Sequence, residues 1–208
     1  MAAIEHQHAT NEVLKNIRSR HSVRNFIPEK EVSDRDIHAI LEAANQAPSA
    51  HNQQSWRFIV LRGSKKDELV DLVAGKAANF PRPTCTLLRM ACRSIASAGT
   101  VIAVANSGEL IRRGPRLFAV NKVEVSDFFR IMEIQSSAAA VQNMLLAATS
   151  LGIGSVWLGI LILIKDEVLS FLGEPQGEFM AIVPVGYPLR PSSSPKKQPL
   201  ATCVKYLS

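Results

Sequence analysis

Three arginines, Arg18, Arg20 and Arg24, stand within a short stretch of the chain, and Ser22 lies between the last two. An arginine guanidinium presents a planar fork of N–H donors that matches the oxygens of phosphate and carbonyl groups. A cluster of this kind can hold an anionic ligand. It can equally be a solvated basic face at the end of a helix, where the helix dipole favours cations. The spacing alone leaves both interpretations open.

A second candidate is the polar loop at residues 49–54, SAHNQQ, which falls between a predicted helix and a predicted strand. Every side chain in it except that of Ala50 can donate or accept a hydrogen bond. Loops held between regular elements often bind polar ligands, although many are only turns. The pair Lys196 and Lys197, near the end of the chain, adds positive charge but is a weak signal alone.

Several motifs that would define a reaction are absent from the sequence. A G-x-G pattern begins at Gly152, but Trp157 stands where the dinucleotide-binding fingerprint needs its third glycine. The chain has no G-x-x-x-x-G-K-[ST] loop, no G-x-S-x-G elbow and no H-E-x-x-H pair. The histidines show no metal-ligand spacing with cysteines or carboxylates. We therefore expect neither a metal site nor a catalytic triad.

The composition is that of a globular protein: of 208 residues, 47% are hydrophobic and 20% are charged, which excludes a disordered chain. The formal net charge is +6, so nucleic acid, an anionic membrane and a phosphorylated small molecule are the partners to weigh. No nucleic-acid-binding motif is present. The longest apolar run, residues 156–164, is shorter than the ~20 residues that span a bilayer. We expect no nucleic-acid or membrane partner.

The N-terminus lacks the basic and then apolar order of a signal peptide, so we expect a cytoplasmic protein. The three cysteines are too few and too irregularly spaced for a disulfide framework or a zinc site. We expect them to be small buried residues in the reduced form.

Apolar periodicity and capping residues predict the elements that must position these candidates. Helices are expected from Thr10 or Asn11, from Ser33, and over residues 65–74, 87–97, 126–151 and 165–172. Buried strands are expected over residues 56–61, 100–105 and 179–185. Residues 106–125 follow no regular pattern, and we expect them to form a mobile cover. This alternation of helices and short buried strands favours a single α+β domain over residues 1–208.

Together, these segments resemble the FMN-dependent nitroreductase family. The similarity begins at residues 20–26, RHSVRNF, and continues at residues 47–58, APSAHNQQSWRF. It extends to the end of the long predicted helix and the residues after it, LGIG at 151–154 and WLG at 157–159, and to VPVGYP at 183–188. These blocks occur in the family's order over most of the chain.

The resemblance implies an α+β fold with three layers, in which helices flank a mostly antiparallel central sheet and two copies intertwine as a homodimer. It also implies two FMN sites at the interface between the copies. By position in the motifs, the residues that would bind FMN are Arg20, His21, Ser22, Arg24, Pro48, Ser49, Ala50, Asn52, Gln54, Leu158, Gly159, Lys196 and Lys197. Ser55 stands where the family usually has proline, and Lys197 stands where arginine is common, so the affinity for FMN is left open.

The resemblance implies particular roles for the basic residues. Arg20 and Ser22 would bind the phosphate and the ribityl end of FMN. Lys196 and Lys197 would complete the phosphate clamp. Arg24 would lie near flavin N1 and O2, where a cation favours the anionic reduced flavin.

The remaining residues would contact the flavin ring. Residues 48–54 would reach the flavin of the partner copy. Leu158 and Gly159 would lie against the isoalloxazine, with a backbone N–H near N5. The flavin would carry the chemistry, so no catalytic side chain is expected.

The implied activity is that of an NAD(P)H-dependent FMN oxidoreductase. NADH or NADPH would pass a hydride to flavin N5 and leave, and a nitroaromatic, a quinone or a related small-molecule acceptor would then take its place in a ping-pong reaction. The alternative is the same fold and flavin with a different reaction: substrate desaturation, reductive dehalogenation or flavin fragmentation.

Overall fold

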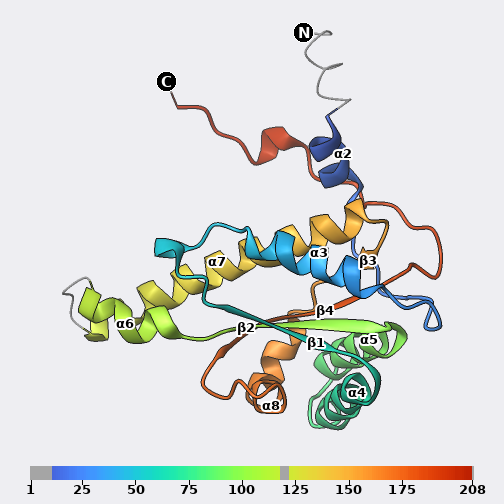
Figure 1. Ribbon diagram of the computed structural model, residues 1–208, viewed down its shortest axis with the longest axis horizontal. Helices are drawn as coiled ribbons and strands as arrows, with labels where there is room; N and C mark the ends of the chain where they lie inside the picture. The colour runs from blue at the N-terminus through green and yellow to red at the C-terminus, as the bar shows by residue number, and fades with distance from the viewer. Residues whose placement is uncertain (1–10, 118–121, 208) are drawn as a thin grey trace.

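The computed structural model describes residues 11–117 and 122–207 of the chain. At its centre is a four-stranded sheet with the strand order β1-β2-β4-β3, in which every neighbouring pair is antiparallel. The strands are β1 (Trp56–Leu61), β2 (Thr100–Asn106), β3 (Gly154–Ser155) and β4 (Glu178–Gly186). Helices cover both faces of this sheet, so the sheet is the middle of three layers (Figure 1).

One outer layer consists of α3 (Asp34–Asn45) and α7 (Lys122–Ser150), with the short α2 (Glu12–Ser19) beside the C-terminal part of α7. Successive side chains of a strand point to opposite faces of its sheet. Ile102 and Val104 of β2 therefore point towards this layer and pack in its apolar core.

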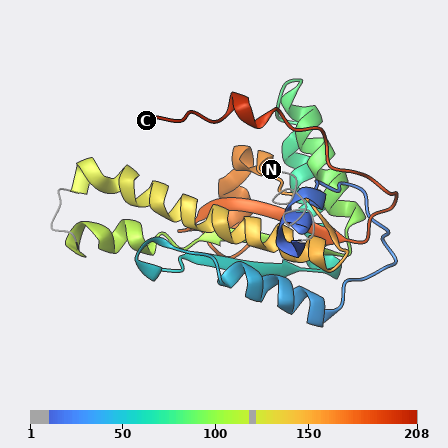
Figure 2. The same cartoon turned by 90° about the horizontal axis from the view of Figure 1, so that it is seen from above.

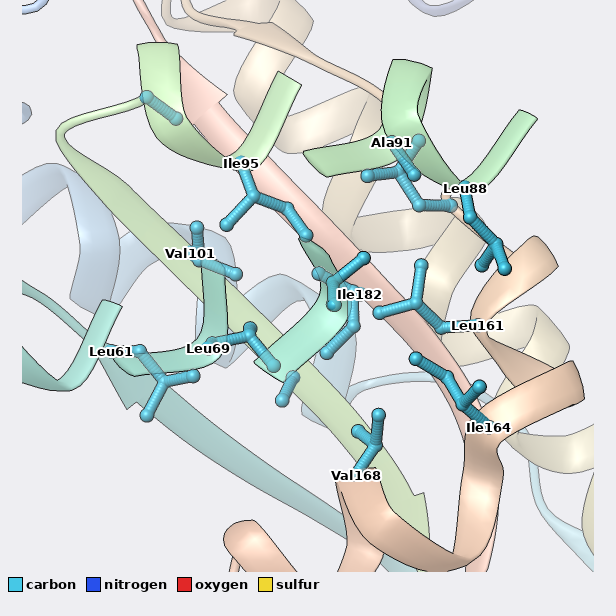
Figure 3. Close-up of a cluster of buried hydrophobic side chains, with 14 of the residues drawn as sticks. Leu61, Leu69, Leu88, Ala91, Ile95, Val101, Leu161, Ile164, Val168 and Ile182 are labelled. Carbon is cyan, nitrogen blue, oxygen red and sulfur yellow. The ribbon is translucent and has the colours of Figure 1, made fainter. Parts of the chain in front are cut away.

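The other outer layer contains α4 (Gly63–Ala77), α5 (Thr84–Ser97), α8 (Lys165–Phe171) and the 3-10 turn Ile160–Ile164. Figure 3 shows the side chains that fill this second core: Leu61, Leu69, Leu88, Ala91, Ile95, Val101, Leu161, Ile164, Val168 and Ile182. Strand β2 is buried along its whole length because it lies between the two cores. Within the part of the chain that the structure describes, no helix is both long and apolar enough to cross a membrane.

Local signals explain why these elements begin where they do. The Asn11 side chain accepts a hydrogen bond from the Leu14 N–H at 3.0 Å, and the Ser33 hydroxyl accepts one from the Asp36 N–H at 3.1 Å. These bonds satisfy amide groups that have no partner within the first helical turn. The three predicted strands are confirmed, with bounds that differ from the expected ones by at most one residue. Helix α4 runs on to Ala77, past its predicted end.

The expectation of an irregular segment at residues 106–125 is wrong for most of its length. Glu109–Leu117 forms helix α6, whereas residues 118–121 lie outside the described residues. A Cβ atom at Gly114 would lie only 2.6 Å from the ring of Phe129, so α6 packs against α7 where a glycine permits close approach. Gly114 therefore serves a helix–helix contact and does not break the helix. Helix α6 and the beginning of α7 project together past one end of the sheet (Figure 1).

The cysteines are free thiols in different environments. Cys85 and Cys92 are partly buried, but Cys203 is exposed in the C-terminal tail, so the expectation that all three are buried is wrong for Cys203. Burial, with a smaller contribution from the negative charge of Asp71, raises the pKa of the Cys92 thiol.

A matched pair of glycine substitutions tests how tightly residues 20–26 pack on the sheet. A Cβ atom at Gly154 would meet the Cβ atom of Val23 at 2.9 Å, so we expect Gly154→Ala to lower the free energy of unfolding by about 1–3 kcal/mol, as overpacking usually does. Gly75, within α4, has open space around it, and Gly75→Ala should leave stability unchanged or raise it by about 0.5–1 kcal/mol. Chemical denaturation measures both, and an unaltered stability of Gly154→Ala would contradict the packing described.

Candidate functional site

The first basic segment is held along the edge of the sheet beside β3. The Val23 N–H donates to the Ser155 carbonyl at 3.0 Å, and Ser22 forms a parallel bridge with Ser155. Val23 and Phe26 are buried, and Phe26 packs against Gly186, where a Cβ atom would lie 3.1 Å from the aromatic ring. Because these apolar residues face the core, Ser22 and Arg24 are left exposed to solvent.

A polar cavity lies beside this segment. It has a volume of about 490 Å³ and is bounded by residues 22–25 and by residues 189–192 of the C-terminal tail. The Leu189 N–H donates to the Asn25 carbonyl at 3.0 Å, which holds the start of the tail against the segment. Arg24 and Arg190 therefore line the same cavity from the two ends of the chain.

His21 makes a second connection between the segment and the tail. Its Nδ1 lies 2.9 Å from the Ser19 carbonyl oxygen, and its Nε2 lies 2.7 Å from the Ser192 hydroxyl. A carbonyl oxygen only accepts, so Nδ1 is the donor, and in a neutral ring Nε2 then accepts a hydrogen bond from Ser192. His21 thus orients the tail where it passes the polar cavity.

An apolar cavity of about 350 Å³ adjoins the polar one, and Arg24 lines both. Its walls come from α5 and from the loop after β3: Leu87, Met90, Ala91, Ser94, Trp157, Leu158, Gly159 and Ile160. The loop is fixed to the sheet because the Leu158 N–H donates to the Ile182 carbonyl at 2.9 Å and the Ile182 N–H donates back at 3.3 Å.

The polar loop at residues 49–54 adopts a strained backbone. His51, Asn52 and Gln54 all have positive φ, between 49° and 53°, a region that residues other than glycine rarely adopt. The Ser136 hydroxyl of α7 accepts a hydrogen bond from the Ala50 N–H at 3.1 Å. Backbone strain of this kind is concentrated at functional sites, where surrounding contacts impose it.

The loop lies at the opposite end of the sheet from the polar cavity. Trp56, two residues after the loop, pairs with Asn106, and Asn106 pairs with Glu178 at the start of β4. Ser155, which holds the first basic segment, pairs instead with Val185 near the end of β4. Glu178 and Val185 are seven residues apart, which is about 23 Å at the usual rise of a strand. Figure 1 shows the same separation along α7.

The structure thus divides the thirteen residues expected to bind FMN into groups. Ser22, Arg24, Leu158 and Gly159 line the two adjoining cavities, and His21 bonds to the cavity wall at Ser192. Arg20 is not among the residues that line either cavity. The expected residues of the loop at 48–54 lie towards the other end of the sheet. Lys196 and Lys197 are exposed in the C-terminal tail, which runs away from the sheet (Figure 2). Among the described residues, no hydrogen bond or ion pair connects either lysine to residues 20–24.

Part of both cavity walls was not predicted. Leu87 and Met90 of α5 line the apolar cavity and are 47% and 43% exposed, whereas the sequence only indicated that they lie in a helix. The available signal was that α5 has more apolar positions than one buried face requires. Arg190 and Ser192 were not among the residues expected to bind FMN, because no local sequence signal shows that the C-terminal tail turns back towards Asn25.

Known proteins resemble the chain in sequence and in structure. Residues 17–187 match the nitroreductase family. A protein of Archaeoglobus fulgidus, named as a candidate NADH dehydrogenase/NAD(P)H nitroreductase, is 33% identical over 182 residues, which cover 85% of this chain and 86% of that protein. A similarly named protein of Methanothermobacter thermautotrophicus is 28% identical and is covered over 78% of its length, again by 85% of this chain.

Solved structures share the fold. A candidate nitroreductase of Desulfovibrio desulfuricans in complex with FMN is 30% identical, with a TM-score of 0.69 over 95% of this chain and 98% of that one. A nitroreductase with bound FMN from Desulfitobacterium hafniense is 25% identical, with a TM-score of 0.73 over 96% and 100% of the two chains. The three-layer fold and the antiparallel sheet are therefore those of nitroreductases, as the resemblance implied. The chain belongs to the nitroreductase family and is an oxidoreductase.

Proposed function

We propose that the protein binds FMN and uses NADH or NADPH to reduce nitroaromatics, quinones or related acceptors. The observation that carries this proposal is the pair of adjoining cavities that share Arg24, one polar and basic and the other mainly apolar. FMN has the same two-part chemistry, since it joins an anionic phosphate and a hydroxylated chain to a flat aromatic ring. The FMN complexes of related nitroreductases support the assignment.

Arg24 and Arg190, which line the polar cavity, and Arg20, which precedes the cavity wall in the chain, would suit an anion. None of the ion pairs found among the described residues involves Arg20, Arg24 or Arg190, so these three charges are not neutralised by a carboxylate. Arg20 and Ser22 would bind the phosphate and the ribityl chain, with His21 orienting the tail beside them. Lys196 and Lys197 would complete the phosphate clamp through the tail.

The apolar cavity supplies the environment for the ring. Arg24, at its mouth, would lie near N1 and O2 and stabilise negative charge there. The Leu158 N–H is already bonded to the Ile182 carbonyl, so we assign the Gly159 N–H to flavin N5. When bound, FMN supplies the hydride acceptor and donor, while the protein orients the two substrates and excludes water.

The site requires a second copy of the chain in this proposal. In one copy, Pro48, Ser49, Ala50, Asn52 and Gln54 lie towards the end of the sheet that carries Asn106 and Glu178, away from the polar cavity beside Ser155. A homodimer would instead offer this loop to the partner's flavin. Apolar side chains that a single copy leaves exposed support such an interface: Val13, Ile17, Phe128 and Ile131, which are 46–66% exposed on α2 and α7.

Substitution of Arg20 tests the position of the phosphate. Arg20→Ala should weaken FMN binding about 10- to 100-fold, because it removes a charge-assisted hydrogen bond to the phosphate. Flavin fluorescence titration measures the change. Arg35→Ala, which removes an exposed arginine on α3, is the control and should bind FMN like the unaltered protein. Equal retention of FMN by Arg20→Ala through dialysis would contradict the assignment.

An anaerobic titration tests the reaction itself. NADH or NADPH should bleach the visible absorbance of the FMN-loaded protein, and a nitroaromatic or quinone added afterwards should restore it. A protein that stays colourless after FMN is supplied would refute the proposal. Bleaching by another reductant but by neither nicotinamide would instead favour desaturation, dehalogenation or flavin fragmentation on the same fold.

A further inference from the structure

One turn of α7 carries polar side chains that are bonded to three other segments. Glu133, which is 1% exposed, accepts a hydrogen bond at its Oε1 from the Leu110 N–H at 2.7 Å. Leu110 lies in the first turn of α6, whose leading N–H groups have no acceptor within the helix. The Glu133 carboxylate therefore caps α6 from a neighbouring helix.

The next turn of α7 holds the polar loop and the end of β2. The Ser136 hydroxyl accepts the Ala50 N–H and donates to the Met132 carbonyl at 2.6 Å. The buried Ser137 hydroxyl donates to Oδ1 of Asn106, the last residue of β2. Glu133, Ser136 and Ser137 thus form a polar hub on α7 that joins α6, the loop at 48–54 and the sheet.

The surroundings of Glu133 are polar and only partly satisfied. Among the described residues, the buried polar atoms without a hydrogen-bond partner are Asn106 Nδ2, Ser107 Oγ, Glu133 Oε2 and Glu178 Oε2. They lie in one region, since Asn106 pairs with Glu178 across the sheet and both Glu178 and Arg112 act electrostatically on Glu133. Unpaired buried atoms of this kind disfavour folding, but removal of the carboxylate would also leave the Leu110 N–H without its acceptor. The bond from the Leu110 N–H to the buried carboxylate therefore points to a role in positioning α6.

The charge of Glu133 responds to its surroundings. Burial raises the pKa of its carboxyl, and the negative charge of Glu178 adds to the rise. The Leu110 N–H, the Ser55 hydroxyl and the positive charge of Arg112 oppose it. Glu178 is itself paired with Arg130, so the charged groups around Glu133 come from α6, α7 and β4.

We propose that Glu133 is a positioning residue that couples α6 to the loop at residues 48–54, so that both segments keep one arrangement relative to the flavin of the partner copy. This inference rests on the proposed function. Both segments lie at the same end of the sheet, where α6 projects outwards (Figure 1). The ionised carboxylate holds α6 firmly, because a hydrogen bond to a charged acceptor is stronger than one to a neutral acceptor.

Hydrogen–deuterium exchange of the protein without flavin tests the coupling directly. Glu133→Gln keeps the shape and an acceptor but removes the charge, and it should speed exchange of residues 109–116 and of residues 48–54 severalfold. Glu133→Ala should speed both by about tenfold or more. Glu42→Gln, an exposed glutamate of α3, is the control and should change neither segment. Unaltered exchange in α6, or faster exchange in α6 without any change in the loop, would overturn the proposal.

The pH dependence separates positioning from simple stabilisation. A buried carboxyl with a raised pKa favours the folded state fully below its unfolded value of about 4.5 and loses that contribution as the pH rises through its folded pKa. Glu133→Gln should therefore be at least as stable as the unaltered protein at pH 7, yet exchange faster in both segments.

In the FMN-loaded enzyme, Glu133→Gln should raise the acceptor KM with little change in kcat. A Glu133→Gln variant that loses stability at pH 7, or one that leaves the acceptor KM unchanged, would contradict the positioning role. Failure of the unaltered protein to bind FMN would refute the proposed function, whereas the exchange experiment would still decide the coupling.

Discussion

The backbone hydrogen bond from Val23 to Ser155 is the contact on which the candidate site depends. It adds residues 22–26 to the edge of the sheet and turns Val23 and Phe26 into the core. The alternation of an extended chain then leaves Ser22 and Arg24 facing outwards, where the tail and the loop after β3 meet them. A basic cluster with two possible interpretations in the sequence thereby becomes one wall of two adjoining cavities.

The length of the sheet imposes a second constraint. It separates the cavities from the strained polar loop, so a single chain holds the two halves of the proposed flavin site at opposite ends. Helix α7 runs between these ends, and its polar hub ties the loop to α6 (Figure 1). The same geometry that makes one copy insufficient would let two copies complete each other, and it would make the conformation of α6 in one copy relevant to the flavin of the other.

Much of this was accessible from local sequence signals. The caps at Asn11 and Ser33, the three predicted strands and the family motifs predicted the fold. The motifs also contain Ser22, Arg24, Leu158 and Gly159, which line the two cavities. What was missed depends on contacts between distant residues. Helix α6 was not expected because the packing of Gly114 against Phe129 is tertiary, and Glu133 was not singled out because its partner, the Leu110 N–H, belongs to that helix.

The central claim is that each flavin site is shared between two copies, and complementation between two inactive variants tests it most directly. One variant carries Arg24→Ala, and the other carries Asn52→Gly, which suits the positive φ at that position while removing the side chain. Each alone should fail to hold FMN. Unfolded together in equal amounts and refolded, they should recover about one quarter of the sites, because half of the dimers would be mixed and each mixed dimer would contain one intact site. No recovery in the mixture, with each variant folded, would contradict a shared site.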